Sequence, residues 1–403
     1  MDRTLLAWSG NGESDFMVRI AGCQYHRITA ARRLPIKSEG RHQRRYERRK
    51  AKREVHKMQI TAELSTDVFS YTHLMEAGHQ CCNGVNWKHS TQLFKANFML
   101  NIYHLYKSVE NGTFKTKGFV EFDLVERGKK RHIKSIHITE RTVQKCLCTN
   151  YLVPHLERGM IYDNGASVKG KGTAFTLDRL VCHLNRYYRK HGSNGYIVLF
   201  DFHDYFNSLR HDHIFEIYDQ YLPDGMAKMM AKQFVRDNGG DIGLGLGSQV
   251  YQMTAVCYCN VIDHYFKDQL RVKGYGRYMD DGYIIAETLE EANSYVMDLV
   301  DLSSGIGLSM NPKKLHIQRI DRQFEFLKTR ILMLPSGHVL RRITRRNVTA
   351  ERRKLKRISA GVADGRFDKQ MLERSLASWL GYAKHFEAKR TINEMTKLYK
   401  KLK

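Results

Sequence analysis

Long apolar runs are missing from this 403-residue sequence: no stretch approaches the roughly 18 consecutive apolar residues that a membrane-spanning helix requires. The first residues, Met1-Asp2-Arg3, also lack the order of charged and then apolar residues that marks a secretion signal. We therefore expect a cytoplasmic protein that does not enter a membrane. Because 42% of the residues are hydrophobic, the chain can still bury a core, and its length suggests two or three lobes.

Metal-ligand and disulfide patterns are missing as well. The eight cysteines are scattered and form no C-x-x-C pair, and the nineteen histidines form no H-E-x-x-H motif. A zinc site and a disulfide scaffold are therefore disfavoured, and we expect reduced thiols. The glycine- and lysine-rich segment 163–173 lacks the G-x-x-x-x-G-K-[ST] order of a P-loop, which argues against an ATPase.

Acidic residues are scarce relative to basic ones. Lys and Arg number 67 against 42 Asp and Glu, which gives a formal net charge of +25 and a pI near 9.7. A phosphate backbone is the commonest partner for such charge, and an acidic membrane surface is the alternative. Basic residues are dense from Arg27 to Lys57, so we predict a basic N-terminal extension, residues 1–63, that binds RNA or is a merely solvated charged helix. Its candidate nucleic-acid contacts are Arg44, Arg45, Arg48 and Arg49.

One adjacent pair of acids stands out in this basic chain. Short apolar or aromatic runs flank Asp280 and Asp281 within residues 277–285, a pattern that predicts a β-hairpin with the acids at its turn. Neighbouring carboxylates repel each other, and a cation that prefers oxygen ligands, such as Mg²⁺, offsets that repulsion. A solvated Asp-Asp-Gly turn is the alternative, so a third carboxylate is needed to favour a metal site.

Asp201 is the candidate third carboxylate, because it lies at the end of the apolar strand predicted over residues 196–202. Together with Asp280 it would hold two metal ions close to each other. Such a pair activates a 3′-hydroxyl group and stabilises the departing pyrophosphate in nucleotidyl transfer. The sequence therefore predicts two Mg²⁺ ions, with Mn²⁺ as a substitute. If a helix begins directly after the acid, Tyr205 and Leu209 share its face with Asp201.

These residues carry a resemblance to reverse transcriptases. Tyr278-Met279-Asp280-Asp281 resembles the Tyr-x-Asp-Asp box of that family, and the strand that ends in Asp201 is similar to its first catalytic motif. The resemblance implies RNA-directed DNA polymerase activity. It also implies an α+β right-hand polymerase with fingers at 64–195, a palm of antiparallel sheet plus helices at 196–335, and a helical, basic thumb at 336–403.

The resemblance also assigns roles to single residues. Asp201, Asp280 and Asp281 would be the catalytic metal ligands. The Phe202 carbonyl would join them, and Phe206 stands where the family has an aromatic gate against the ribose 2′-hydroxyl. The candidates for binding the triphosphate are Arg131 and Lys130, at the tip of a basic hairpin predicted around residues 126–133. Gly247 and Gln252 would contact template and nucleotide, and Lys314 would protonate pyrophosphate. Lys169 and Lys171 would bind the template, and Arg352 and Arg353 the duplex.

Two departures from the family pattern are visible. Leu246-Gly247, followed by Tyr251-Gln252, occupies the place of Gln-Gly-x-x-x-Ser-Pro, and Lys328 stands where the family usually has glycine. A hydrophobic residue before the glycine and a Gln after the serine position are typical of diversity-generating retroelement enzymes. Related substitutions occur in defence-associated bacterial reverse transcriptases.

Three biological roles stay open on the sequence alone. The first is a phage-defence enzyme that copies its own non-coding RNA into cDNA, and the second is an error-prone enzyme of a diversity-generating retroelement. The third, from another class, is an RNA-binding scaffold with an idle palm. The expected partners are the RNA template, the cDNA product and dNTPs, while an accessory protein and a homo-oligomer are left open.

Overall fold

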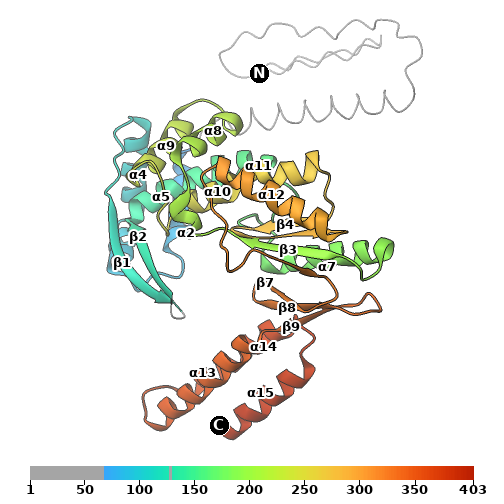
Figure 1. The fold of residues 1–403 in the computed structure, drawn as a ribbon. Helices are drawn as coiled ribbons and strands as arrows, with labels where there is room; N and C mark the ends of the chain where they lie inside the picture. Colours follow the sequence, from blue (N-terminus) through green and yellow to red (C-terminus); the bar gives the residue numbers. More distant parts are fainter. Residues whose placement is uncertain (1–67, 127–128) are drawn as a thin grey trace, which may run out of the picture. The chain divides into compact units, whose positions relative to one another are not determined.

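The described part of the chain begins after the predicted N-terminal extension. The structure, a computed structural model, describes residues 68–126 and 129–403, and all of them belong to one unit that starts at Thr61. The predicted RNA contacts Arg44, Arg45, Arg48 and Arg49 lie outside the described residues. The first described helix is α2, Tyr71–Cys82 (Figure 1).

A four-stranded antiparallel sheet carries the acids. Its strand order is β4-β5-β3-β6, with bounds Tyr275–Tyr278, Asp281–Ala286, Tyr196–Asp201 and His316–Arg319. Side chains alternate between the two faces of a strand. Accordingly, Val198 and Phe200 of β3 belong to one hydrophobic cluster, whereas Ile197 and Leu199 belong to another. The sheet therefore separates two cores, which explains why β3 is a continuous apolar run.

The larger core joins the predicted fingers to the predicted palm. It runs from Phe69 to Leu308, so the two lobes on either side of the boundary predicted after residue 195 share one apolar cluster. Short helical segments cover Cys148–Leu152, Val153–Leu156, Glu157–Gly159 and Tyr265–Gln269. The helices that contribute are α2, α3 (His89–Ala96), α4 (Phe98–Glu110), α5 (Ile138–Leu147), α8 (His211–Tyr221), α9 (Met226–Arg236), α10 (Gln249–Tyr258), α11 (Asn260–His264) and α12 (Leu289–Gly305).

No α-helix begins directly after Asp201, so the condition under which the sequence places Tyr205 and Leu209 on one helical face is not met. Asp204 adopts a φ of 44°, in the left-handed range, and a right-handed helix cannot continue through such a residue. The chain instead forms one 3₁₀ turn, Tyr205–Ser208, and α8 begins only at His211. Tyr205 and Leu209 are nevertheless both buried.

The smaller core lies between the sheet, helix α7 (Thr173–His191) and a second sheet. That sheet has the order β7-β8-β9, with bounds Phe324–Phe326, Thr329–Met333 and Val339–Ile343. Leu180, Ile197 and Phe324 meet in this core. The palm–thumb boundary predicted after residue 335 falls in the turn between β8 and β9.

A long β-hairpin confirms the hairpin that the sequence predicts around residues 126–133. Strand β1 (Phe119–Glu126) pairs with β2 (Lys129–Ile136) in an unbroken antiparallel register. Ile133 forms a parallel bridge with Leu246, and the Lys134 amide donates to the Leu246 carbonyl at 3.2 Å. The hairpin is thereby attached to the glycine-rich segment that precedes α10.

Three helices follow β9 in the C-terminal part, and its role as a thumb stays a prediction. They are α13 (Arg345–Ala363), α14 (Lys369–Ala383) and α15 (Lys389–Leu402). Leu355, Leu376 and Met395 pack in a third apolar cluster between them. None of the described helices is both long and apolar enough to cross a bilayer.

The turn between β7 and β8 explains the departure at Lys328. Phe326 pairs with Thr329, so Leu327 and Lys328 alone make the turn, with φ of 46° and 59°. Such two-residue turns favour glycine in second place, because a side chain is disfavoured at positive φ. We expect Lys328→Gly to raise the free energy of unfolding by about 0.5–1 kcal/mol, measured by denaturant titration. Lys328→Ala is the matched control, because alanine keeps the Cβ atom. An equal rise in the free energy of unfolding in both variants would contradict the claim that the positive φ at position 328 is strained.

Candidate active site

Three carboxylates meet where β3 ends and β4 turns into β5. Asp201, the last residue of β3, pairs with Asp281, the first residue of β5. Asp280 lies in the turn of the β4–β5 hairpin, which confirms the hairpin predicted from the sequence. One carboxylate oxygen from each acid lies within 4.8 Å of the other two. The strand pairing thus brings acids from distant segments into one cluster.

Burial and repulsion by the neighbouring acids oppose the ionisation of Asp280 and Asp281. Asp201 is buried, and Asp280 and Asp281 are half-buried. Burial and the neighbouring Asp201 charge raise the pKa of Asp280. Burial also raises the pKa of Asp281 to about 7, although the Lys314 ammonium acts in the opposite direction. A cluster of this kind is stabilised by a bound cation.

Lys314 and Asn311 hold the buried carboxylate of Asp201. The Lys314 ammonium donates to Asp201 Oδ2 and lies 3.4 Å from Asp281 Oδ1. Asn311 Nδ2 donates to Asp201 Oδ1 at 3.0 Å, and the Asn311 amide donates to the Asp201 carbonyl at 2.8 Å. Burial lowers the pKa of Lys314, but its hydrogen bond to Asp201 and the nearby acids raise it overall. The lysine therefore stays charged beside the acids.

The donor set fits a divalent metal. Carboxylate oxygens are the ligands that Mg²⁺ and Mn²⁺ prefer, and the Lys314 ammonium already occupies a cation position among them. Phe202 forms an antiparallel bridge with Met310. The two hydrogen bonds of this bridge join residues 201 and 311, and residues 203 and 309. Neither bond uses the Phe202 carbonyl, so this oxygen can serve as the further ligand that the sequence predicts.

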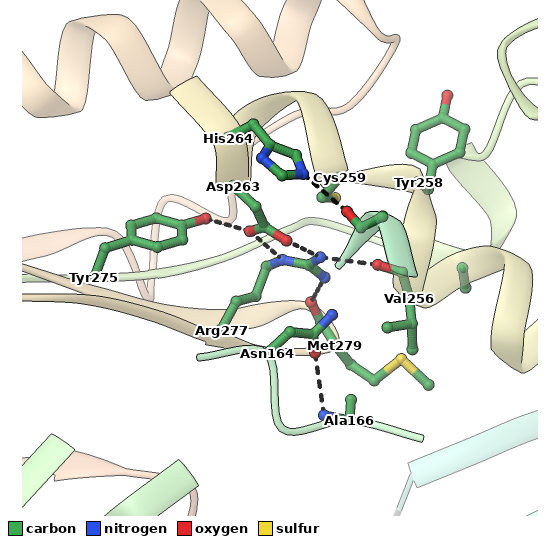
Figure 2. Close-up of polar contacts among 12 residues, drawn as sticks. Asn164, Ala166, Val256, Tyr258, Cys259, Asp263, His264, Tyr275, Arg277 and Met279 are labelled. Carbon is green, nitrogen blue, oxygen red and sulfur yellow. Dashed lines mark hydrogen bonds and ion pairs between the residues drawn. The ribbon is translucent and has the colours of Figure 1, made fainter. Parts of the chain in front are cut away.

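Arg277 contacts the β4–β5 turn that carries Asp280, and it was not among the residues predicted for the site. Its guanidinium forms a fully buried ion pair with Asp263, 2.5 Å from Nη2 to Oδ2, and donates to the Met279 carbonyl at 2.8 Å (Figure 2). A charged residue inside a buried strand was the signal that could have found it, since arginine is seldom buried without a partner. Asn311 was missed because nothing local connects it to Asp201.

Phe206, the predicted ribose gate, lies in the 3₁₀ turn after β3. It is half-buried, and its ring packs edge-on against Tyr205 with 5.9 Å between the centroids. Its carbonyl accepts a hydrogen bond from the Leu244 amide at 2.8 Å. Tyr205 is itself fixed, because its hydroxyl donates to the Ala255 carbonyl at 2.5 Å. Rigid neighbours on both sides thus set the position of Phe206, and its role as a gate stays a prediction.

The glycine-rich segment fits closely against the fingers hairpin. Gly247 has a φ of 131°, and a Cβ atom there would lie 2.9 Å from the Lys134 carbonyl oxygen. The lack of a side chain at Gly247 therefore serves the contact with β2, and a nucleotide contact through its backbone stays a prediction. Gln252 is exposed on the first turn of α10. Tyr251, which replaces the family's Ser or Thr, is buried and donates to the Phe234 carbonyl at 2.7 Å.

Four other predicted contacts lie on the β1–β2 hairpin and the thumb. Lys130 and Arg131 belong to β2, next to the hairpin tip. Arg353 is exposed on α13, and Arg352 pairs with Glu394 of α15 at 2.9 Å. Arg353 is thus exposed and available for a phosphate contact. Arg352 would have to leave the Glu394 carboxylate before it could bind a phosphate.

The two predicted template lysines differ in their surroundings. Lys169 is exposed. Lys171 is half-buried and donates to the carbonyls of Tyr162 at 2.7 Å and Asn164 at 3.1 Å. Asn164 in turn forms a parallel bridge with Arg277 of β4. Lys171 therefore stabilises the loop that Asn164 joins to β4, and Lys169 is the better candidate for a template contact.

Comparisons with known proteins identify relatives. Residues 117–331, more than half of the chain, match the family described as reverse transcriptase (RNA-dependent DNA polymerase). A comparison with curated proteins gives no match.

Solved structures that resemble the fold include three telomerase structures. One is apo telomerase from Candida tropicalis truncated from its C-terminal domain, with a TM-score of 0.44, 14% identity, and coverage of 56% of this chain and 55% of that one. Another is apo telomerase from the same organism, with a TM-score of 0.42, 14% identity, and coverage of 56% and 48%. The third is telomerase from Candida albicans in complex with a TWJ fragment of telomeric RNA, with a TM-score of 0.45, 11% identity, and coverage of 77% and 59%. The match spans about half the length of these telomerase chains.

Proposed function

Because the chain belongs to the reverse transcriptase (RNA-dependent DNA polymerase) family, we propose that it copies an RNA template into DNA from deoxynucleoside triphosphates. The observation that carries this proposal is the cluster of Asp201, Asp280 and Asp281 at one end of the sheet. A merely structural palm has no use for three carboxylates that repel one another. Their retention at one point supports a cation site that serves nucleotidyl transfer.

Each residue of the cluster has a part in this reaction. Asp201, Asp280 and Asp281, with the Phe202 carbonyl, would hold two Mg²⁺ ions. Bound there, the ions would activate the primer 3′-hydroxyl and stabilise the charge on the leaving pyrophosphate. Asn311 keeps the Asp201 carboxylate in place through its 3.0 Å hydrogen bond.

Lys314 is the candidate proton donor to the pyrophosphate product. Its ammonium stays protonated at neutral pH and reaches Asp201 and Asp281. Cations bound by these carboxylates would compete with the ammonium for the same oxygens, so Lys314 would be free to donate to another group close by. An ammonium close to departing pyrophosphate can donate the proton that the product needs.

Phe206 supports the choice of deoxynucleotides. We expect Phe206→Ala to reduce the ratio of kcat/KM for dNTP over rNTP by about 10²-fold, because the smaller side chain leaves room for a 2′-hydroxyl. Phe206→Tyr keeps the ring and is the control. Single-nucleotide extension with dCTP and CTP measures the ratio, and an unchanged ratio in Phe206→Ala would rule out the gate.

The biological role we favour is phage defence with a dedicated non-coding RNA as the template. An error-prone retroelement enzyme is the second candidate, and Leu246 before Gly247 with Gln252 after it is the feature that favours it. Sequencing the RNA and DNA that copurify with the chain, beside an Asp280→Ala/Asp281→Ala variant, separates these roles. One structured RNA with matching DNA only in the wild type supports a dedicated template, whereas adenine-specific errors in that DNA favour the retroelement.

A further inference from the structure

We propose that Arg277 and Asp263 are positioning residues that hold the turn Tyr278–Asp281 in the shape needed to bind metal. This inference rests on the proposed polymerase function, since it concerns the same carboxylates. Neither residue belongs to the acid cluster itself. Both act on it through the backbone of the turn.

All three guanidinium nitrogens of the fully buried Arg277 side chain donate hydrogen bonds. Its Nε donates to Asp263 Oδ1 at 2.8 Å and its Nη2 to Asp263 Oδ2 at 2.5 Å. Nη2 also donates to the Val256 carbonyl of α10, and Nη1 donates to the Met279 carbonyl, both at 2.8 Å (Figure 2). Asp263 accepts a further bond from the Tyr275 hydroxyl at 2.6 Å. One guanidinium thus joins α10 and α11 to the catalytic turn.

The turn needs such a support for two reasons. Met279 adopts a φ of 55°, a conformation that residues other than glycine rarely take and keep only where their surroundings impose it. The next two residues, Asp280 and Asp281, carry carboxylates that repel each other and Asp201. Without the bond to its carbonyl, Met279 could relax and carry Asp280 away from the cluster.

The shape of the arginine side chain suits this task better than that of lysine. A guanidinium presents its donors in a rigid planar fork, so it can face a carboxylate and two carbonyls at once. A lysine ammonium is a single point charge on a flexible stem and cannot span the same acceptors. Lysine at position 277 should keep much of the charge pairing with Asp263 and lose the hydrogen bond to the Met279 carbonyl.

The backbone of Arg277 ties a third segment to the same place. Its amide donates to the Asp163 carbonyl at 3.3 Å, and its carbonyl accepts from the Gly165 amide at 3.1 Å. Asp163 is fixed in turn by Arg179 and Lys267, each at 2.6 Å. The catalytic turn is therefore supported from the loop, from α10 and from α11.

The test compares metal binding with stability in matched variants of the full chain. Arg277→Lys keeps a cation, and the double variant Arg277→Met/Asp263→Asn removes both buried charges together, which avoids an unpaired ion and should preserve folding. Tyr275→Phe is the control, because it loses a bond in the same cluster but does not contact the turn. Mn²⁺ binding is measured by electron paramagnetic resonance, stability by thermal unfolding, and activity as the Mg²⁺ concentration that gives half-maximal primer extension.

We expect the double variant and Arg277→Lys to weaken Mn²⁺ binding at least about 10-fold and to raise the half-maximal Mg²⁺ concentration in parallel, while Tyr275→Phe stays within about 2-fold of wild type. Wild-type Mn²⁺ binding in a folded double variant would overturn the inference, as would equal losses in Tyr275→Phe. If wild type binds Mn²⁺ but extends no primer, the proposed polymerase function fails, whereas the effect of Arg277 on Mn²⁺ binding still decides the positioning role.

Discussion

Replacing both Asp280 and Asp281 by asparagine is expected to lower the rate of DNA synthesis by roughly 10³-fold or more, because bound metal contributes several kcal/mol of charge stabilisation to the transition state. The substitution keeps the size of both side chains and removes their mutual repulsion. The unfolding temperature should therefore stay level or rise. Incorporation of labelled dNTP on an RNA template measures the rate, and filter binding measures affinity for the template.

Asp301→Asn is the matched control for this prediction. Asp301 is an exposed acid on α12, and its replacement should leave synthesis and binding unchanged. Undiminished synthesis by the Asp280→Asn/Asp281→Asn variant would refute the catalytic assignment. Loss of RNA binding together with synthesis would instead show that the acids maintain the fold.

Asp263→Asn is expected to lower the free energy of unfolding by about 3–5 kcal/mol. The substitution leaves the Arg277 guanidinium fully buried with no counter-charge, since both side chains of the pair are completely excluded from solvent. Breaking a buried pair by removing one partner is far more costly than removing both. Denaturant titration of wild type and variant gives the difference directly.

Adding Arg277→Met to Asp263→Asn should recover most of the lost stability, because the orphaned charge is then gone. A double variant as unstable as the single one would show that shape, and not charge pairing, accounts for the loss. An Asp263→Asn variant as stable as wild type would show that Arg277 reaches solvent or finds another partner. Either result would weaken the case for a rigid support beneath the turn.

The parts of the site that the sequence predicted are those with a local signal. Asp280 and Asp281 lie between two short strands whose alternation is readable, and their hairpin is confirmed. Asp201 ends an apolar strand, so its place at one end of that strand could be expected. Since both strands belong to one antiparallel sheet, a single register then brings the acids together.

The parts that were missed depend on distant residues or on one backbone angle. Whether a helix begins directly after Asp201 was left as a condition, and the left-handed conformation of Asp204 that prevents it is not revealed by any periodicity. Arg277 was part of the hairpin pattern, but its partner Asp263 comes from a separate helix. The nucleotide contact of Gly247 stays a prediction, but the close approach of the Lys134 carbonyl, 2.9 Å from where a Cβ atom would lie, has no local signal in the sequence.

The most direct test of the central claim is RNA-templated primer extension by the full chain with dNTPs. With Mg²⁺ or Mn²⁺ present, the account predicts DNA products that reach the end of the RNA template, and no product after chelation with EDTA. The same reaction with Asp201→Asn should give no product. Failure of the wild type to extend a primer that it demonstrably binds, with either metal, would contradict the claim that this cluster catalyses nucleotidyl transfer.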